Sequence, residues 1–173
     1  LTSSPAEARA SVLRSSVLSL ASIFGAQVPA VPASTDATGA ELGLRFSATN
    51  SGFVSGVRFY KGTGNTGAHV GSLWSSSGQR LANVTFANES ASGWQSATFS
   101  NPVPVNAGDT YVVSYTAPVG HYAAQPWAFA SSSLDAPPFL VDGGFNAGGG
   151  GVFGDPGTFP SRSFQSSNYF VDV

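Results

Sequence analysis

The sequence predicts an all-β domain, an antiparallel β-sandwich of jelly-roll or immunoglobulin-like type with long loops rich in Gly and Pro. Several segments alternate apolar and polar residues with a period of two, the pattern of half-buried strands. The 173 residues include 21 Gly and 11 Pro, and only 9% are charged. Turn residues separate the strand segments at intervals of roughly 10–15 residues, which is typical of sandwiches and not of alternating strands and helices. The length suits a single core.

The N-terminal region divides into a short lead-in segment and the first predicted strand. Ser4-Pro5-Ala6-Glu7 has the pattern of a capping box, with Ser4 at the N-cap and Glu7 three residues later. Residues 1–16 are therefore expected to form a short helix or a flexible linker. The domain proper is expected to cover residues 17–173, beginning with a strand over Val17–Phe24.

The clearest predicted strand is Glu41–Ala48, where Leu42, Leu44 and Phe46 alternate with more polar residues. This pattern indicates a strand with one face in the core. Further strands are predicted over residues 53–60, 71–74, 80–87, 94–100, 103–105, 110–116 and 169–173.

The segment Phe53–Tyr60 carries apolar residues on both faces, which predicts a central strand. Strict alternation places Phe53 with Val57 and Phe59, and it places Val54 on the opposite face. Arg58 and Tyr60 share that opposite face.

Residues 117–167 have a different character, because Pro and Gly recur and the aromatic residues follow no period. This segment is expected to form long loops over the sandwich. The loops need anchors to be ordered. The expected anchors are the phenylalanines at positions 139, 145, 153, 159 and 164.

Charge and composition narrow the classes of partner. The seven basic and nine acidic residues nearly cancel and form no basic run, so we expect no nucleic-acid partner. No apolar stretch approaches the roughly 20 residues that span a bilayer, so membrane insertion is not expected. The chain has no Cys, and it lacks Met even at position 1, which indicates a processed or excised fragment.

The segment Gly56–Trp74, which reads GVRFYKGTGNTGAHVGSLW, resembles an uncharacterised domain family of bacterial secreted and cell-surface proteins. Members of this family occur beside glycoside hydrolases and immunoglobulin-like modules. The resemblance implies an extracellular accessory β-sandwich with neighbouring domains in its parent chain. It continues through residues 80–86, 89, 93–95, 102–103, 107–108, 111, 114–115 and 168–172.

The sequence lacks the usual catalytic and metal-binding constellations. No Gly-x-Ser-x-Gly motif occurs, and the acidic residues are spread singly, so we expect no enzyme and no catalytic residue. His69 and His121 lie 52 positions apart without Cys, which is a poor zinc pattern. No cofactor is expected, although a structural calcium ion at a sandwich edge remains open.

The first candidate ligand surface is the Gly-rich loop Lys61–Val70. A sugar binder needs a flat aromatic platform beside fixed polar groups. Tyr60 and Trp74 could supply the platform. Lys61, Asn65, His69 and Gln95 could supply the polar groups.

Each of these residues also has a structural interpretation. Trp74 could belong to the core, and His69 could tie the long loop down by hydrogen bonds. Arg58 could pair across strands with Glu41 or Glu89.

The second candidate surface comprises His121, Tyr122 and Trp127, which occur in the irregular segment. Aromatic residues on loops at one end of a sandwich commonly bind sugars, although the same residues could form a lid over the core. The leading hypothesis is a carbohydrate-binding accessory module. The alternatives are a structural spacer or protein-interaction module, and an enzyme acting on glycans, which needs two carboxylates about 5–10 Å apart.

Overall fold

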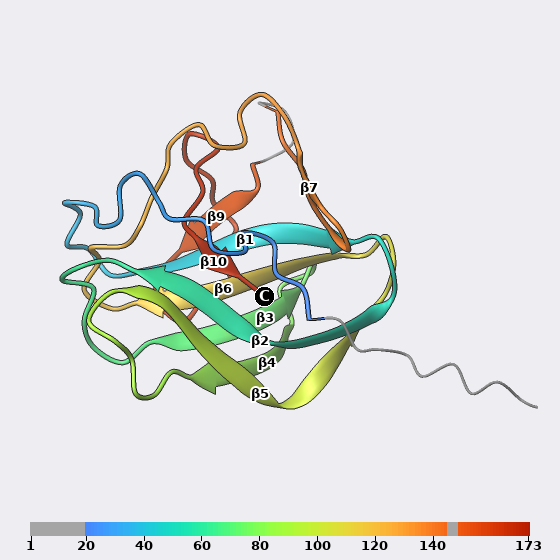
Figure 1. Cartoon of the computed structure of the whole chain (residues 1–173), viewed down its shortest axis with the longest axis horizontal. Helices are drawn as coiled ribbons and strands as arrows, with labels where there is room; N and C mark the ends of the chain where they lie inside the picture. The colour runs from blue at the N-terminus through green and yellow to red at the C-terminus, as the bar shows by residue number, and fades with distance from the viewer. Residues whose placement is uncertain (1–19, 145–148) are drawn as a thin grey trace, which may run out of the picture.

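The computed structural model describes residues 20–144 and 149–173 and confirms the predicted all-β sandwich. Two antiparallel sheets pack together, and the described residues contain no helix (Figure 1). The larger sheet has the order β4 (Arg80–Thr85), β3 (Val70–Ser75), β6 (Thr110–Ala117), β1 (Ala40–Ala48), β8 (Phe139–Val141) and β7 (Leu134–Ala136), and β9 (Gly151–Gly154) also pairs with β1. The smaller sheet has the order β10 (Val171–Asp172), β2 (Gly52–Lys61) and β5 (Gly93–Val105).

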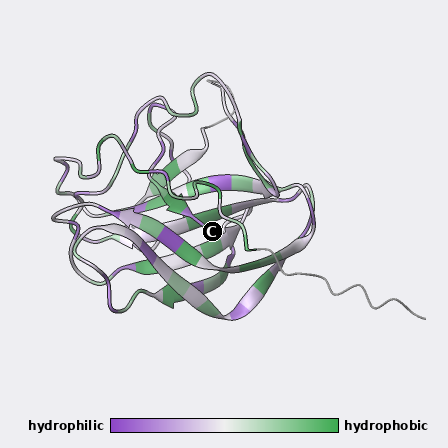
Figure 2. Cartoon of the chain, viewed as in Figure 1, coloured by the Kyte–Doolittle hydropathy of each residue, from purple (hydrophilic) through white to green (hydrophobic). Residues whose placement is uncertain are grey.

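The core between the sheets follows the alternation along the strands (Figure 2). Leu42, Leu44 and Phe46 of β1 are each no more than 1% exposed, as their alternation predicts. Phe59 of β2 stacks on Tyr115 of β6 with ring centroids 4.1 Å apart, which joins the two sheets at the centre. Large aromatic rings contribute much of the buried apolar area of such a core.

A β-bulge in β2 changes the predicted faces of that strand. The pairing of β2 with β5 shifts register between Val54 and Gly56. Val54 therefore faces the core with Val57 and Phe59, while Phe53 is 70% exposed. The strict alternation predicted the opposite placement of Phe53 and Val54 and was wrong there, because a bulge adds one residue to one strand.

The described N-terminal segment lies against the smaller sheet, and the described part of the first predicted strand does not form a strand. Residues 1–19, including the capping box, lie outside the described residues, and Leu20–Phe24 is irregular. The backbone N–H groups of Ile23 and Phe24 donate instead to the buried carboxylate of Asp172, at 2.7 and 3.0 Å. Arg58 pairs with this same carboxylate at 3.4 Å, and not with Glu41 or Glu89 as the sequence suggested.

The region predicted as long loops contains three short strands, β7, β8 and β9. Two other predictions also change: residues 94–100 and 103–105 form one strand, β5, and the strand predicted over 169–173 is limited to Val171–Asp172. Strand β5 is an edge strand and tolerates Pro102 and Pro104, because a proline removes no ladder hydrogen bond from an unpaired edge. The irregular segments over residues 29–39 and 120–133 lie on the same side of the molecule as β9 (Figure 1).

The described residues form strands and loops, and they contain no helix that is long and apolar enough to cross a membrane.

Candidate functional site

Lys61, Asn65 and His69 of the loop Lys61–Val70 are joined with Glu89 and Tyr115 in a chain of hydrogen bonds that we call the loop network. Lys61 Nζ lies 2.8 Å from Glu89 Oε2, and His69 Nδ1 lies 2.8 Å from the same carboxylate. His69 Nε2 lies 2.9 Å from the side-chain oxygen of Asn65, and the Asn65 amide donates to the Tyr115 hydroxyl at 3.3 Å. The loop network therefore runs from the surface to the centre of the sandwich.

His69 and Asn65 are both 0% exposed, so neither side chain offers a polar group to a ligand. The His69 ring also lies 4.9 Å from the ring of Phe59 in the core. Burial lowers the pKa of His69, and the Glu89 carboxylate opposes this shift. Buried polar groups are stabilising when each has a partner and costly when one is removed, so the loop network holds the loop on the core.

The same loop packs against the segment that carries the second candidate surface. A Cβ atom on Gly62 would lie 2.2 Å from the Pro32 carbonyl oxygen and 2.6 Å from that of His121. Only glycine permits this approach of backbone to backbone. The loop therefore packs directly against the backbone of Pro32 and His121.

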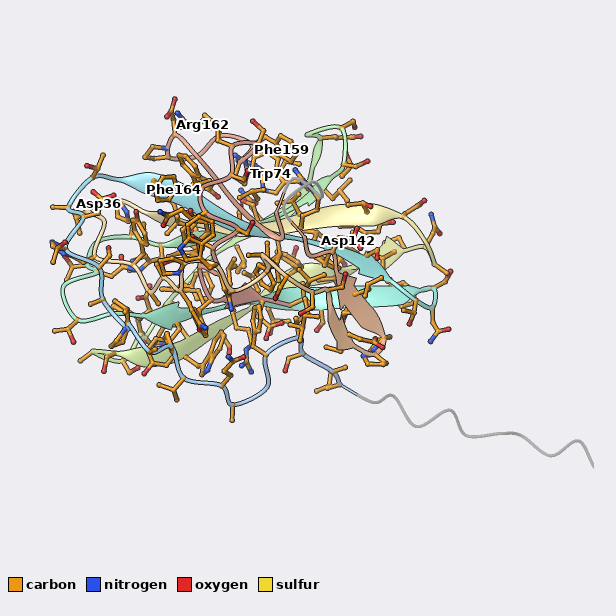
Figure 3. The ribbon with its side chains drawn as sticks, turned by 90° about the horizontal axis from the view of Figure 1, so that it is seen from above. Asp36, Trp74, Asp142, Phe159, Arg162 and Phe164 are labelled. Atoms are coloured by element: carbon orange, nitrogen blue, oxygen red, sulfur yellow. The ribbon has the colours of Figure 1, made fainter. Side chains whose placement is uncertain are left out.

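Trp74 lies on the outer face of the larger sheet, where it is 4% exposed. Phe159 covers its ring from 5.7 Å, the Arg80 guanidinium lies 4.4 Å from the ring centroid, and Figure 3 shows Trp74 beside Phe159. The indole N–H donates to the Ser114 hydroxyl at 2.8 Å, and Ser114 donates in turn to the buried Glu41. Trp74 thus belongs to a small second core and has no ring face open to a sugar.

Gln95 and Tyr60 also make internal contacts. Gln95 is 5% exposed and bonds to Ser90 and to the Gly93 carbonyl, which closes the turn before β5. The Tyr60 ring meets Trp94 edge to face at 5.8 Å, and Arg58 lies 3.9 Å above the Trp94 ring. The side chains of Arg58, Tyr60 and Trp94 thus pack against one another on the outer face of the smaller sheet.

A cleft elsewhere on the surface also combines aromatic and polar side chains, and it is open to solvent. It is a cleft of about 410 Å³, which we call the aromatic cleft, within the range of about 300–1,000 Å³ that holds small ligands. Its walls come from the segment before β1, from Tyr122, from β9 and from residues that precede β10. The side chains that define it are Asp36, Tyr122, Phe153, Asp155, Arg162, Phe164 and Tyr169.

One wall of the aromatic cleft is formed by Asp36 and Tyr122. The Tyr122 hydroxyl donates to Asp36 Oδ2 at 2.8 Å, and the Thr38 N–H donates to Asp36 Oδ1 at 2.8 Å. These two groups, led by the Thr38 N–H, lower the pKa of Asp36, which keeps it a carboxylate. The Tyr122 ring rests edge-on against Tyr169 at 5.9 Å, and burial raises the pKa of its hydroxyl.

The opposite wall is built on the pairing of Arg162 with β9. Arg162 exchanges two backbone hydrogen bonds with Phe153, and its guanidinium lies 4.8 Å from the Phe153 ring centroid. Its Nη2 atom lies 2.7 Å from Asp155 Oδ1, so this cation is already paired. Phe164 is 58% exposed, and Figure 3 shows it on the same side of the molecule as Asp36 and Arg162.

Of the predicted ligand-binding residues, only Tyr122 lines the aromatic cleft. His121 is half-buried, with Nδ1 3.1 Å from the Ser34 carbonyl oxygen. Trp127 is 53% exposed outside the cleft lining, and its backbone N–H donates to the Gln165 carbonyl. From the sequence, Phe153 and Phe164 were predicted to anchor loops. No local sequence pattern reveals that they line one cleft with Asp36 and Arg162.

The described residues contain no group of three or more His, Asp or Glu side chains able to hold a metal ion. The two acids whose pKa burial raises, Glu41 and Asp172, are 1% and 0% exposed. Both accept backbone N–H groups, from Gly157 for Glu41 and from Ile23 and Phe24 for Asp172. They hold loops in place and are not among the residues that line the aromatic cleft.

The described residues form a β-sandwich with an open depression that is lined by aromatic and charged side chains. A family model described as Domain of unknown function (DUF4082) matches residues 26–171, which is most of the chain. The chain belongs to this family, and the expected membership of an uncharacterised domain family is confirmed. No curated protein matches the chain.

Proposed function

We propose that the domain is a non-catalytic carbohydrate-binding module and that the aromatic cleft holds the sugar. The observation that carries this proposal is the exposed ring of Phe164 in one cleft with the fixed polar groups of Asp36 and Arg162. Sugars present apolar C–H faces and a ring of hydroxyl groups, so an open aromatic ring beside oriented acceptors and donors suits them.

The state of the acids supports binding without catalysis. A glycoside hydrolase needs one carboxyl group that stays protonated to act as the general acid. In the aromatic cleft, hydrogen bonds from Thr38 and Tyr122 lower the pKa of Asp36 and oppose that role. Asp155 is engaged by Arg162 at 2.7 Å. We therefore assign both acids to ligand binding.

The accessory role rests on the family resemblance. We place the domain in an extracellular bacterial protein, where it holds a neighbouring enzyme or adhesive domain near a polysaccharide. A single shallow cleft gives weak affinity, and such modules gain strength from avidity when they are tethered to a second binding or catalytic domain.

Retention on insoluble and gel-embedded polysaccharides tests this proposal. We expect the domain to be retained by at least one polymer from a panel covering neutral, amino-bearing and acidic types. Phe164→Ala should weaken the retention about tenfold, the usual effect of removing a central aromatic contact.

Phe53→Ala is the matched control, because Phe53 is 70% exposed and lies outside the aromatic cleft. Its retention should equal that of the unaltered domain. Absence of retention on every polymer, or equal losses in both variants, would contradict the proposal and favour a spacer or protein-interaction module.

A further inference from the structure

The charges that line the aromatic cleft bear on which class of sugar it accepts. Among the described residues of its lining, the charged side chains are Asp36, Asp155 and Arg162. The single cation is therefore outnumbered by carboxylates. The whole chain also has a formal net charge of −2.

The position of Arg162 further limits its use by a ligand. Its guanidinium bonds to Asp155 at 2.7 Å and lies over the Phe153 ring, while its backbone pairs with Phe153 in both directions. An acidic sugar that bound the remaining N–H groups of Arg162 would bring a second negative charge beside the Asp155 carboxylate. Like charges brought together in this way disfavour a partner.

Asp36 favours the opposite class of sugar. Its carboxylate accepts one bond on each oxygen, from the Thr38 N–H and the Tyr122 hydroxyl. A carboxylate has about four acceptor positions, so capacity remains for sugar hydroxyl or ammonium groups. These donors hold the group in place before a ligand arrives.

We propose that the aromatic cleft selects polysaccharides by charge, binding neutral and amino-bearing sugars and excluding those that carry carboxylate or sulfate groups. This inference rests on the proposed carbohydrate-binding function and names its ligand class.

Affinity gel electrophoresis separates the two proposals. The gels contain a neutral polymer (glucomannan or hydroxyethyl cellulose), chitosan, or an acidic polymer (pectate, alginate or carrageenan). We expect retardation by neutral polymers or chitosan, with none by acidic ones. Retardation by chitosan should weaken between 50 and 500 mM NaCl, because salt screens exposed charges, while retardation by neutral polymers should persist.

A charge variant provides the second measurement. Asp36→Asn combined with Asp155→Asn leaves Arg162 as the one charged group of the described lining, so retardation by acidic polymers should appear or rise several-fold. Asp142→Asn is the control, because Asp142 is exposed outside the lining and lies well apart from Phe164 and Arg162 in Figure 3.

The outcomes are distinct. Retardation of the unaltered domain by acidic polymers, at least equal to that by the others, would overturn the charge selection and leave carbohydrate binding intact. No change in the double variant would also overturn it. Retardation by none of the polymers would overturn both proposals.

Discussion

The loop network and the aromatic cleft contain the same kinds of side chain, yet one is closed and the other open. In the loop network, His69 and Asn65 are 0% exposed and bond to partners within the domain. In the aromatic cleft, Phe164 is 58% exposed and Asp36 is turned toward the cleft. The comparison teaches that polar and aromatic residues of a Gly-rich loop can have a purely structural role, with no part in ligand binding.

The loop that carries the network nevertheless packs against a segment next to the aromatic cleft. The glycine at position 62 allows the loop to lie against the backbone of His121, next to Tyr122 of the cleft wall. The loop network therefore stabilises the region on which the cleft is built, while its buried His69 and Asn65 side chains offer no group to a ligand. Changes in the two regions should have separable effects on stability and on binding.

The largest effect is expected from His69→Ala. This change leaves the Glu89 carboxylate and the Asn65 amide without their common partner, and breaking a buried polar pair costs about 3 kcal/mol of unfolding free energy. Urea denaturation measures the loss. Polysaccharide retention at a temperature where the variant stays folded should be unchanged.

His121→Ala is the control for that variant, because the half-buried His121 has one hydrogen bond, to the Ser34 carbonyl oxygen, among those we describe. Its cost should be about 1 kcal/mol. A larger loss for His121→Ala than for His69→Ala would show that the loop network is not the main support of this end of the sandwich.

A smaller effect, on binding alone, should distinguish the aromatic cleft from its surroundings. Trp127 is 53% exposed but lies outside the cleft lining, so Trp127→Ala should weaken polysaccharide retention by less than about threefold. Phe164→Ala, measured in the same assay, should weaken it more. The reverse order would move the binding surface from the cleft to the neighbouring loop.

The smallest effect is expected from Tyr122→Phe, which removes the hydroxyl that donates to Asp36. The pKa of Asp36 should rise toward its ordinary value of 3.8, because a bond to the ionised form is lost. Asp36 contributes stability that is present above this ordinary value and is lost as the pH falls through its lowered folded value. In the variant, the pH range between these two values, over which the stability contribution of Asp36 is lost, should therefore become narrower.

Carboxyl ¹³C NMR titration measures the shift, and Tyr60→Phe, on the outer face of the smaller sheet, is the control. An Asp36 pKa equal in all three proteins would mean that the Thr38 N–H alone holds the carboxylate.

Much of the sandwich could be predicted from the sequence, because apolar residues recur at every second position in a strand with one buried face. Glu41–Ala48 shows this pattern, and β1 covers Ala40–Ala48. The prediction failed where other interactions override the period. The bulge after Val54 reverses a face, and Asp172, distant in sequence, binds the backbone of Ile23 and Phe24 in place of a strand partner.

The candidate ligand-binding residues were harder to predict. Tyr122 was identified because it is an aromatic residue on a loop, and it lines the cleft. Asp36, Arg162 and Phe164 were not identified, because their neighbours in sequence carry no motif. Conversely, His69 and Trp74 resemble binding residues in sequence, and only packing shows that they are buried.

The sequence by itself determined the all-β class, the main strands, the near balance of charge and the family to which the chain belongs. These properties depend on local periodicity, composition and ordered motifs. The tertiary structure alone decided which aromatic and polar groups stay open. A cleft forms where segments more than 100 residues apart meet, and the exposure of a side chain depends on what packs against it.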